Sequence, residues 1–395
     1  MTDDRKLRLL TFSTLFPNAA APSHGIFVEN RLRHLLASGE AETRVIAPVP
    51  WFPSRNPRFG AYSAYAAAPR REHRHGIDID HPRYPLIPKI GMTITPALLY
   101  LWALPAVRRL LASGYDFDLI DAHYFYPDGV AAAVIARRLG KPVTITARGT
   151  DINLIPAYSL PRRQILWAAA RAQGMITVCQ ALKDEMATLG IDSDRITVLR
   201  NGVDLDLFRP ADRDSLRSRS GLTRPTLISV GHLIERKAHD LVIEALPHLP
   251  EFELLIVGDG PEDAKLRALA ARLNVADRVQ FMGRRPHDEL PGLCAAADAL
   301  VLASSREGWA NVLLEAMACG TPVVASNVWG TPEVVAVPEA GRLMAERTGK
   351  SIAEATADLF ANLPDRAATR RYAEGFSWDA TTRGQLDLFR GILGR

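Results

Sequence analysis

Two glutamates with seven residues between them carry the clearest chemical signal in the chain. The segment from Glu307 to Glu315 reads Glu-Gly-Trp-Ala-Asn-Val-Leu-Leu-Glu; it follows an apolar run at 299–303 and opens a helix-like run closed by Gly320 and Pro322. This order places Glu307 in a loop and Glu315 one turn into a helix. Free N–H groups at a helix start favour a diphosphate, and two carboxylates beside it can bind ribose and hexose hydroxyls. The spacing therefore favours a nucleotide-sugar site.

Five further segments accompany the paired glutamates. They are Asn201-Gly-Val-Asp204, Gly231-His-Leu-Ile-Glu-Arg-Lys237, Gly258-Asp-Gly-Pro261, Val279-Gln-Phe-Met-Gly283 and Gly320-Thr-Pro-Val-Val324. In order and spacing, the whole set resembles the family-4 retaining glycosyltransferases of the GT-B fold, of the glycosyl transferases group 1 type. The resemblance covers about half the chain, and the N-terminal half matches more loosely.

The resemblance implies cationic groups that neutralise the diphosphate as the sugar leaves. Lys237 is present, but His232 stands where the family usually has arginine, and a histidine with a pKa of about 6.5 is only partly charged at neutral pH. Arg236 is the alternative source of charge. Arg148 replaces a family histidine that contacts the donor sugar; it would donate to the sugar or to phosphate, and a salt bridge to Asp151 is the alternative.

The resemblance also assigns roles to the remaining candidates. Glu307, Lys237 and Arg148 are the expected catalytic residues; Glu307 would hold the sugar hydroxyls and Glu315 the ribose. On the acceptor side we expect His123 and Asp128, although a loop histidine also has structural uses. The other donor-binding residues are Gly25, His232, Arg236, Gly258, Gly260, Met282, Gly283, Arg284, Gly308, Trp309, Ala310, Asn311 and Val312.

Two other types of site fit poorly. Gly258-Asp-Gly260 follows an apolar strand as in dinucleotide-binding folds, but Asp263 holds the third glycine position and Gln280 occupies the strand expected to carry the ribose-binding acid. Asp-x-Asp triplets, which bind metal in the GT-A architecture, occur only before a strand, in an Arg-rich segment and in a linker. We expect no metal and no cofactor, with the nucleotide sugar as a substrate.

Strand-like and helix-like runs alternate from end to end in two sets. This pattern predicts an α/β protein with parallel sheets covered by helices on both faces, and the GT-B architecture of two Rossmann-like domains facing across a cleft. We expect an acceptor-side domain at 1–200, joined by a returning C-terminal helix at 377–395, and a nucleotide-sugar domain at 201–376.

Composition agrees with a soluble two-domain protein. The chain has 395 residues, 47% hydrophobic and 23% charged, and its three cysteines lack CxxC spacing. No export signal is visible, so we expect a cytoplasmic protein, and frequent Ala and Arg suggest a bacterial source. The longest apolar run, 96–107, is shorter than the roughly 20 residues of a membrane-spanning helix.

Positive charge is concentrated in residues 51–90. This segment holds six Arg and one Lys against three acidic residues, a net +4 that equals the formal charge of the whole chain. Such a patch would hold the protein peripherally at the inner face of an anionic plasma membrane. A solvated Arg-rich loop explains the same charge, and both interpretations stay open at this point.

The resulting hypothesis is a metal-independent, retaining hexosyltransferase. It would move a sugar from UDP- or GDP-sugar to a hydroxyl of a glycan or lipid-linked glycan in bacterial polysaccharide biosynthesis. The resemblance implies that leaving phosphate serves as the base, so no protein base is named. A nucleotide-sugar epimerase on the same fold, or a non-catalytic sugar-nucleotide-binding subunit, are the alternatives.

Overall fold

The chain forms two compact units. The computed structural model describes residues 5–86 and 91–395. The first unit comprises Met1–Arg200 with Asp379–Arg395, and the second comprises Asn201–Trp378. The boundaries expected from the sequence were at residues 200 and 376.

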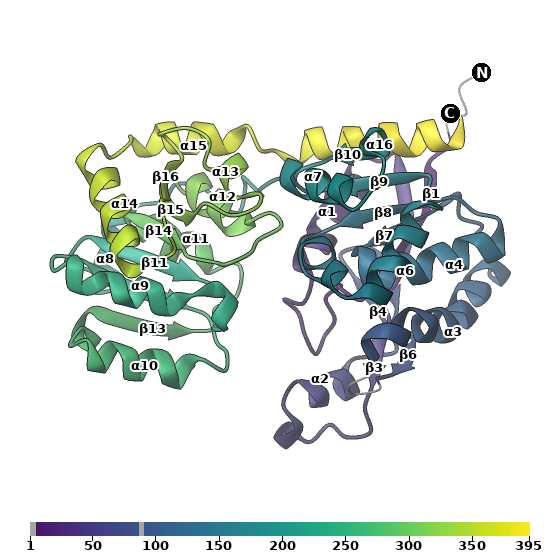
Figure 1. Cartoon of the computed structure of the whole chain (residues 1–395), viewed down its shortest axis with the longest axis horizontal. Coiled ribbons are helices and arrows are strands. Elements are labelled where there is room, and N and C mark those ends of the chain that lie inside the picture. The colour runs from purple at the N-terminus through teal and green to yellow at the C-terminus, as the bar shows by residue number, and fades with distance from the viewer. Residues whose placement is uncertain (1–4, 87–90) are drawn as a thin grey trace. The chain divides into compact units, whose positions relative to one another are not determined.

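An eight-stranded sheet forms the centre of the first unit (Figure 1). Its strands, in spatial order, are β10 (Ile196–Val198), β9 (Gly174–Thr177), β8 (Val143–Ala147), β7 (Leu119–His123), β1 (Leu7–Phe12), β2 (Ala41–Ile46), β5 (Ile77–Asp80) and β4 (Arg71–Arg74). Neighbours pair in parallel, except that β4 runs antiparallel to β5. β7 and β8 are buried along their whole length, as strands with helices on both faces must be.

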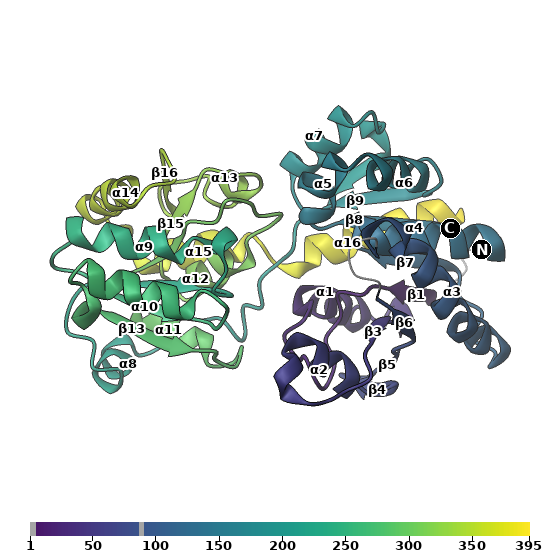
Figure 2. The same ribbon diagram turned by 60° about the horizontal axis from the view of Figure 1, so that its bottom comes forward.

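Helices cover both faces of this sheet. Leu386 and Phe389 of α16 (Trp378–Leu393) share one hydrophobic core with Val28 and Leu32 of α1 (Ile26–Ala37), which confirms that the C-terminal helix returns to the first unit. Right-handed crossovers place the helices that follow β5, β7 and β8 on the other face. These are α3 (Gly91–Ala112), α4 (Val130–Leu139) and α6 (Ser159–Ala169), which pack side by side (Figure 2).

The helix α3 is longer than the apolar run in its sequence. Its segment Met92–Ala112 is long and apolar enough, by length and composition alone, to cross a membrane. In this fold, however, α3 packs against α4 and the short strand β6 (Arg83–Pro85), and Leu99, Ala103 and Val107 are fully buried. It is therefore one of the helices that cover the sheet.

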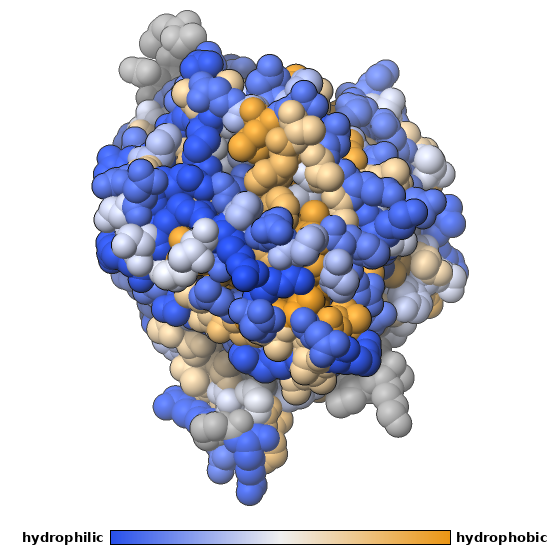
Figure 3. Space-filling model, turned by 90° about the vertical axis from the view of Figure 1, so that its left-hand side faces the viewer, coloured by the Kyte–Doolittle hydropathy of each residue, from blue (hydrophilic) through white to orange (hydrophobic). Residues whose placement is uncertain are grey.

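The second unit has a six-stranded parallel sheet. Its strands, in spatial order, are β13 (Val279–Gly283), β12 (Glu253–Val257), β11 (Thr226–Val230), β14 (Ala299–Leu302), β15 (Val323–Ser326) and β16 (Gly341–Met344). The covering helices include α9 (His239–Ala245), α10 (Asp263–Arg272), α12 (Asn311–Ala318) and α14 (Gly349–Ala361). The face of this unit turned to the viewer in Figure 3 is mostly hydrophilic, with apolar residues confined to small areas.

The chain reverses its direction across the second sheet between β11 and β14. From β11 it proceeds outward to β12 and β13, and then returns to β14 and continues to β15 and β16. The loops that leave these two central strands therefore diverge, which opens a crevice at their carboxyl ends where open α/β sheets bind ligands. These loops carry 231–237 and 303–310.

Candidate active site

Three charged side chains predicted from the sequence meet at the β11/β14 switch point. The Lys237 ammonium lies 2.6 Å from Oε1 of Glu307, and Nη1 of Arg236 lies 3.5 Å from the same oxygen. The two loops are joined by the backbone, because the N–H of Ser305 donates to the Arg236 carbonyl at 2.9 Å. Arg236 also donates to the carbonyl of Arg306 at 2.8 Å. The structure thus brings together two cations and one carboxylate.

The charge on Glu307 is maintained by these neighbours. Burial raises the pKa of its carboxyl, but the positive charges of Lys237 and Arg236 and hydrogen bonds from Lys237 and Ser304 outweigh this, and the pKa lies below its ordinary value. Only 10% of the Glu307 side chain is exposed. An ionised, nearly buried carboxylate accepts hydrogen bonds strongly, as binding of sugar hydroxyls requires.

The second glutamate has a partner that the sequence did not indicate. Nε2 of His287 lies 3.3 Å from Oε1 of Glu315, and the His287 ring packs edge-on against Phe208 with 5.1 Å between ring centroids. The hydrogen bond to Glu315 raises the pKa of His287 above its ordinary value, although burial opposes this. His287 therefore orients Glu315. No local pattern around His287 points to this contact.

The start of α12 differs from the expectation of free backbone donors. The helix begins at Asn311, and the preceding Ala310 has a non-helical backbone (φ −85°, ψ 81°) and no side-chain acceptor. This turn closes on itself, because the N–H of Asn311 donates to the Trp309 carbonyl at 3.1 Å and that of Leu313 to the Ala310 carbonyl at 3.0 Å. The expectation that N–H groups from Trp309 through Val312 are all free was therefore wrong for Asn311.

Side chains around the α12 start hold the loop in place. Trp309 is 7% exposed and packs near Phe376, with 6.0 Å between ring centroids, while Gly308 is half-buried. The Asn201 amide donates to the Asn311 side chain at 3.2 Å, so the linker motif contacts the loop of the paired glutamates.

Glycines allow the other loops at this sheet edge to touch. Gly258 has φ 147°, and a Cβ there would lie 1.9 Å from the Gly231 carbonyl oxygen; a Cβ on Gly260 would lie 2.4 Å from that of Leu233. The N–H of Gly258 donates to the Gly283 carbonyl at 2.9 Å. The structure thus shows close loop packing as the reason for Gly258 and Gly260.

The remaining donor candidates of the second unit lie at the ends of β11 and β13. His232 is exposed, and its Nδ1 contacts the Asp259 carbonyl. Arg284 is exposed as well and pairs with the Asp259 carboxylate at 3.0 Å, whereas Met282 is half-buried at the end of β13. Asp259 therefore holds both basic residues at this rim.

Gly25 occupies a comparable position in the first unit. It has φ 69° and stands directly before α1, and a Cβ would lie 2.3 Å from the carbonyl carbon of Leu15. Only glycine permits this approach between the loop after β1 and the start of α1.

A buried chain of hydrogen bonds holds Arg148 at the end of β8. Its Nη2 lies 2.6 Å from Nδ1 of His123, and Nε2 of His123 lies 3.1 Å from the Asp121 carboxylate. Since a guanidinium only donates, Nδ1 accepts and Nε2 carries the proton that Asp121 accepts. Asp121 also accepts from Gln385 of α16 at 3.0 Å, and Gln385 accepts from Arg31 at 3.1 Å.

This arrangement gives His123 a positioning role. Burial lowers the pKa of His123 to about 4; the Asp121 carboxylate opposes this shift and the positive charge of Arg148 adds to it. The imidazole is therefore neutral near pH 7, with both nitrogens engaged. Sequence reasoning placed His123 on the acceptor side and did not find Asp121 or Gln385.

Asp128 and Asp151 stabilise the neighbouring loops. Asp128 is fully buried and accepts from the N–H and the hydroxyl of Thr14, each at 2.9 Å, which joins the loops after β1 and β7. The Asp151 carboxylate accepts the backbone N–H groups of Phe125, Arg148 and Gly149. The alternative of a side-chain salt bridge between Arg148 and Asp151 thus gives way to a backbone cap.

Among residues 5–86 and 91–395, no three His, Cys, Asp or Glu side chains gather in a way that could hold a metal ion. The Asp-x-Asp triplets are engaged elsewhere: Asp78 pairs with Arg44 and His73, Asp116 with Lys141, and Asp204 accepts backbone N–H groups of its own turn.

Solved structures with the same architecture show the fold. The sucrose-phosphate synthase of Thermosynechococcus elongatus superposes with a TM-score of 0.78 at 21% identity, over 99% of this chain and all of the other. The Anabaena protein Alr3699/HepE, solved with UDP-glucose, gives a TM-score of 0.73 at 22% identity over 97% of this chain and 99% of the other. The two parallel sheets thus define an enzyme of the GT-B fold.

Sequence comparison gives the family. The chain matches the profile described as Glycosyltransferase Family 4 over residues 65–207 and that of Glycosyl transferases group 1 over 212–376. It is 34% identical over 310 residues to the D-inositol 3-phosphate glycosyltransferase of Frankia alni, covering 71% of this chain and 75% of the relative. With the enzyme of that name from Mycobacterium tuberculosis, it shares 36% over 307 residues, covering 71% and 63%. The chain belongs to glycosyltransferase family 4 and is a glycosyltransferase.

Proposed function

We propose that this glycosyltransferase takes a sugar from UDP- or GDP-sugar and transfers it, with retention, to a hydroxyl of a glycan or lipid-linked glycan in bacterial polysaccharide biosynthesis. The contact of Lys237 with Glu307 beside Arg236 carries the proposal, because it combines cations for a diphosphate with a carboxylate for sugar hydroxyls. The complex of Alr3699/HepE with UDP-glucose supports a nucleotide-sugar donor.

Charge development in the reaction explains these residue types. As the bond from sugar to phosphate breaks, negative charge grows on the diphosphate, and Lys237 and Arg236 stabilise it electrostatically. Glu307, kept ionised by these cations, accepts hydrogen bonds from the sugar. Arg148 is the proposed additional donor, and Glu315, oriented by His287, the ribose ligand. Departing phosphate takes the proton of the attacking hydroxyl.

The two cations provide the charge neutralisation that a divalent ion supplies in other transferases, so we propose metal-independent transfer. Activity unchanged by a chelator would agree; activity lost with the chelator and restored by a divalent ion would contradict it. The three buried free thiols, Cys179, Cys294 and Cys319, support a reducing, cytoplasmic location.

The first test is donor binding without metal. A panel of UDP- and GDP-sugars is scored by thermal shift against the wild-type protein, Glu307→Gln and Lys237→Ala. We expect one donor class to stabilise the wild type, with a weaker shift in both variants. A shift that is unchanged in both variants would overturn the assigned site.

Turnover assays then separate the alternatives. With the selected donor, we expect product only when a hydroxyl acceptor is present, and the acceptor panel includes D-inositol 3-phosphate because the relatives carry that name. Conversion of the donor sugar without an acceptor would instead indicate an epimerase. Donor binding without any turnover would favour a non-catalytic subunit.

A further inference from the structure

The outward side of α3 is unusually apolar for an exposed helix. Leu101 is 54% exposed and Trp102 44%, and Ala97 and Pro105 are exposed beside them. Spacings of three and four residues place 97, 101, 105 and 108, and likewise 102, 105 and 109, in rows along this side. These rows end in the exposed residues Arg108 and Arg109. We call residues 97, 101, 102, 105, 108 and 109, together with Arg70, the α3 surface.

The structure separates neutralised arginines from those available to a partner. Of the segment that looked basic in sequence, Arg71 pairs with Asp80 at 2.7 Å and Arg74 with the buried Glu29 at 3.0 Å. Within the described part of the chain, no carboxylate lies within ion-pair distance of Arg70 or Arg109. Counting basic residues in the sequence thus overstated the roles of Arg71 and Arg74.

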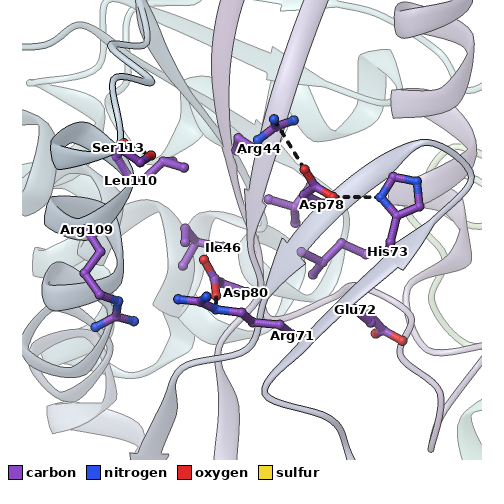
Figure 4. Close-up of a pocket in the computed structure, with 12 residues that line it drawn as sticks. Arg44, Ile46, Arg71, Glu72, His73, Asp78, Asp80, Arg109, Leu110 and Ser113 are labelled. Carbon is purple, nitrogen blue, oxygen red and sulfur yellow. Dashed lines mark hydrogen bonds and ion pairs between the residues drawn. The ribbon is translucent and has the colours of Figure 1, made fainter.

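Arg70 and Arg109 lie around one hollow beside α3. A cavity of about 550 Å³ is lined by Arg70, Arg71, Arg83, Arg109 and Asp80. In the adjoining pocket, Arg109 extends from α3 toward the Arg71–Asp80 pair (Figure 4). Arginines are concentrated there, since burial first and then the charges of Arg70 and Arg55 lower the pKa of Arg83. A hollow with excess positive charge fits phosphate groups.

The opposite flank of α3 is apolar. A groove of about 540 Å³ runs between α3 and α6 over α4, lined by Tyr100, Val130, Val134, Leu160 and Trp167. Tyr158 and Leu160, at the start of α6, are themselves 51% and 46% exposed. Aromatic and aliphatic side chains are thus flanked by arginines on one side of the first unit.

We propose that the α3 surface docks the protein on an anionic phospholipid leaflet. Arg70 and Arg109 bind headgroup phosphates, and Leu101 and Trp102 insert at the boundary between headgroups and acyl chains. Apolar residues for the boundary and cations for phosphate on one helix side are the combination that interfacial helices use. This binding goes beyond the proposed sugar transfer and is measured without donor or acceptor.

Two other occupants fit less well. A second copy related by two-fold symmetry would face the same surface and bring like-charged Arg70, Arg108 and Arg109 together. A spanning α3 would have to leave the fold and expose Leu99, Ala103 and Val107, all 0% exposed in the structure.

The test is flotation of the full chain with vesicles of phosphatidylcholine alone, or of phosphatidylcholine and phosphatidylglycerol in equal parts. We expect binding only to the anionic vesicles, weakening with salt. Arg70→Glu/Arg109→Glu should lower partitioning roughly 30-fold, because each basic residue near such a surface contributes about fivefold. Leu101→Gln/Trp102→Gln should also reduce binding.

Matched controls lie on the second unit. Arg272→Glu/Arg371→Glu makes the same charge change at exposed arginines, and Leu363→Gln alters a leucine that is 48% exposed. Both controls should float like the wild type. Equal loss in Arg272→Glu/Arg371→Glu and Arg70→Glu/Arg109→Glu would show that only net charge matters and would overturn the assigned surface.

Two further measurements exclude the other occupants. Sedimentation without vesicles should give the same mass for the wild type and Leu101→Gln/Trp102→Gln; a dimer lost in that variant would identify a copy interface instead. Soluble glycerol phosphate should not release the protein from vesicles; release would reduce the hollow to a site for free phosphate esters. Quenching of Trp102 fluorescence by brominated acyl chains, lost in Trp102→Phe, should report insertion.

Discussion

Arg148 is held by a neutral histidine, so its effect on catalysis should depend on His123. In His123→Ala the guanidinium loses its acceptor at 2.6 Å, and we expect kcat/KM to fall about tenfold, since one buried hydrogen bond to a charged group is worth about 1.5–3 kcal/mol. If His123 acts only through Arg148, the same change should have no further effect in Arg148→Ala. Steady-state kinetics of both single variants and the double variant measures this coupling.

Stability measurements keep this test interpretable. His123→Ala also leaves Asp121 with one partner fewer in a buried place, so thermal unfolding of each variant sets the assay temperature. Additive losses of kcat/KM in the double variant would show that His123 contributes independently of Arg148, and the positioning role would then be wrong.

How well single residues could be predicted depended on their distance along the chain from their partners. Lys237 and Glu307 carry recognisable local motifs, and the structure joins them. Asp121 and Gln385 are 264 residues apart in sequence, and neither belongs to a local pattern. Their contact exists only because α16 returns to the first unit, so residue types and spacing could not show it.

At the scale of elements, the loops after β11, β12 and β13 require glycine for contact with each other. In Gly258→Ala the new Cβ would lie 1.9 Å from a backbone oxygen at φ 147°, and we expect a loss of about 3 kcal/mol in the free energy of unfolding, with weaker donor binding. Gly283→Ala is the control: at φ 66° it meets nothing within 4 Å and should cost about 1 kcal/mol. Urea unfolding compares them; equal losses would contradict the clash.

Central elements were predictable and edge elements were not. The strands at 143–147, 253–257 and 299–302 have the bounds expected from their apolar runs, because strands buried on both faces need continuous hydrophobic sequence. The β4–β5 hairpin was missed since its Arg-rich sequence resembles a loop. Ile77 and Ile79 alternate with polar residues after a His75-Gly76 turn of positive φ, a signal that its high charge obscured.

For the molecule as a whole, two buried groups should give stability opposite pH dependences. Burial raises the pKa of Asp128 to about 8; hydrogen bonds from Thr14 oppose this, and the nearby Asp151 charge adds to it. In the unfolded chain this carboxyl ionises near its ordinary value of 3.8. The stability from protonated Asp128 is thus complete below that value and is lost as pH rises toward about 8.

The contribution of His123 has the reverse sign. Its folded pKa of about 4 lies below the ordinary 6.5, so between these values the unfolded chain binds a proton that the folded chain excludes, and stability falls as pH falls. Between about pH 4 and 6.5 the two groups therefore oppose each other. Above pH 6.5 the Asp128 contribution remains, with a slope of up to about 1.4 kcal/mol per pH unit.

Asp128→Asn should reveal both effects in the unfolding of the first unit. An amide is similar in shape to the protonated carboxyl and does not ionise, so we expect the variant to gain stability relative to wild type as pH rises from 6.5 to 8. Below pH 6.5 the variant should lose stability more steeply, because the slope from His123 is no longer opposed. Urea unfolding of both proteins across this range gives the difference in free energy, in which groups common to both cancel. A difference that does not change with pH would mean that Asp128 is already ionised in the folded protein near pH 7, paired to Thr14 as a carboxylate.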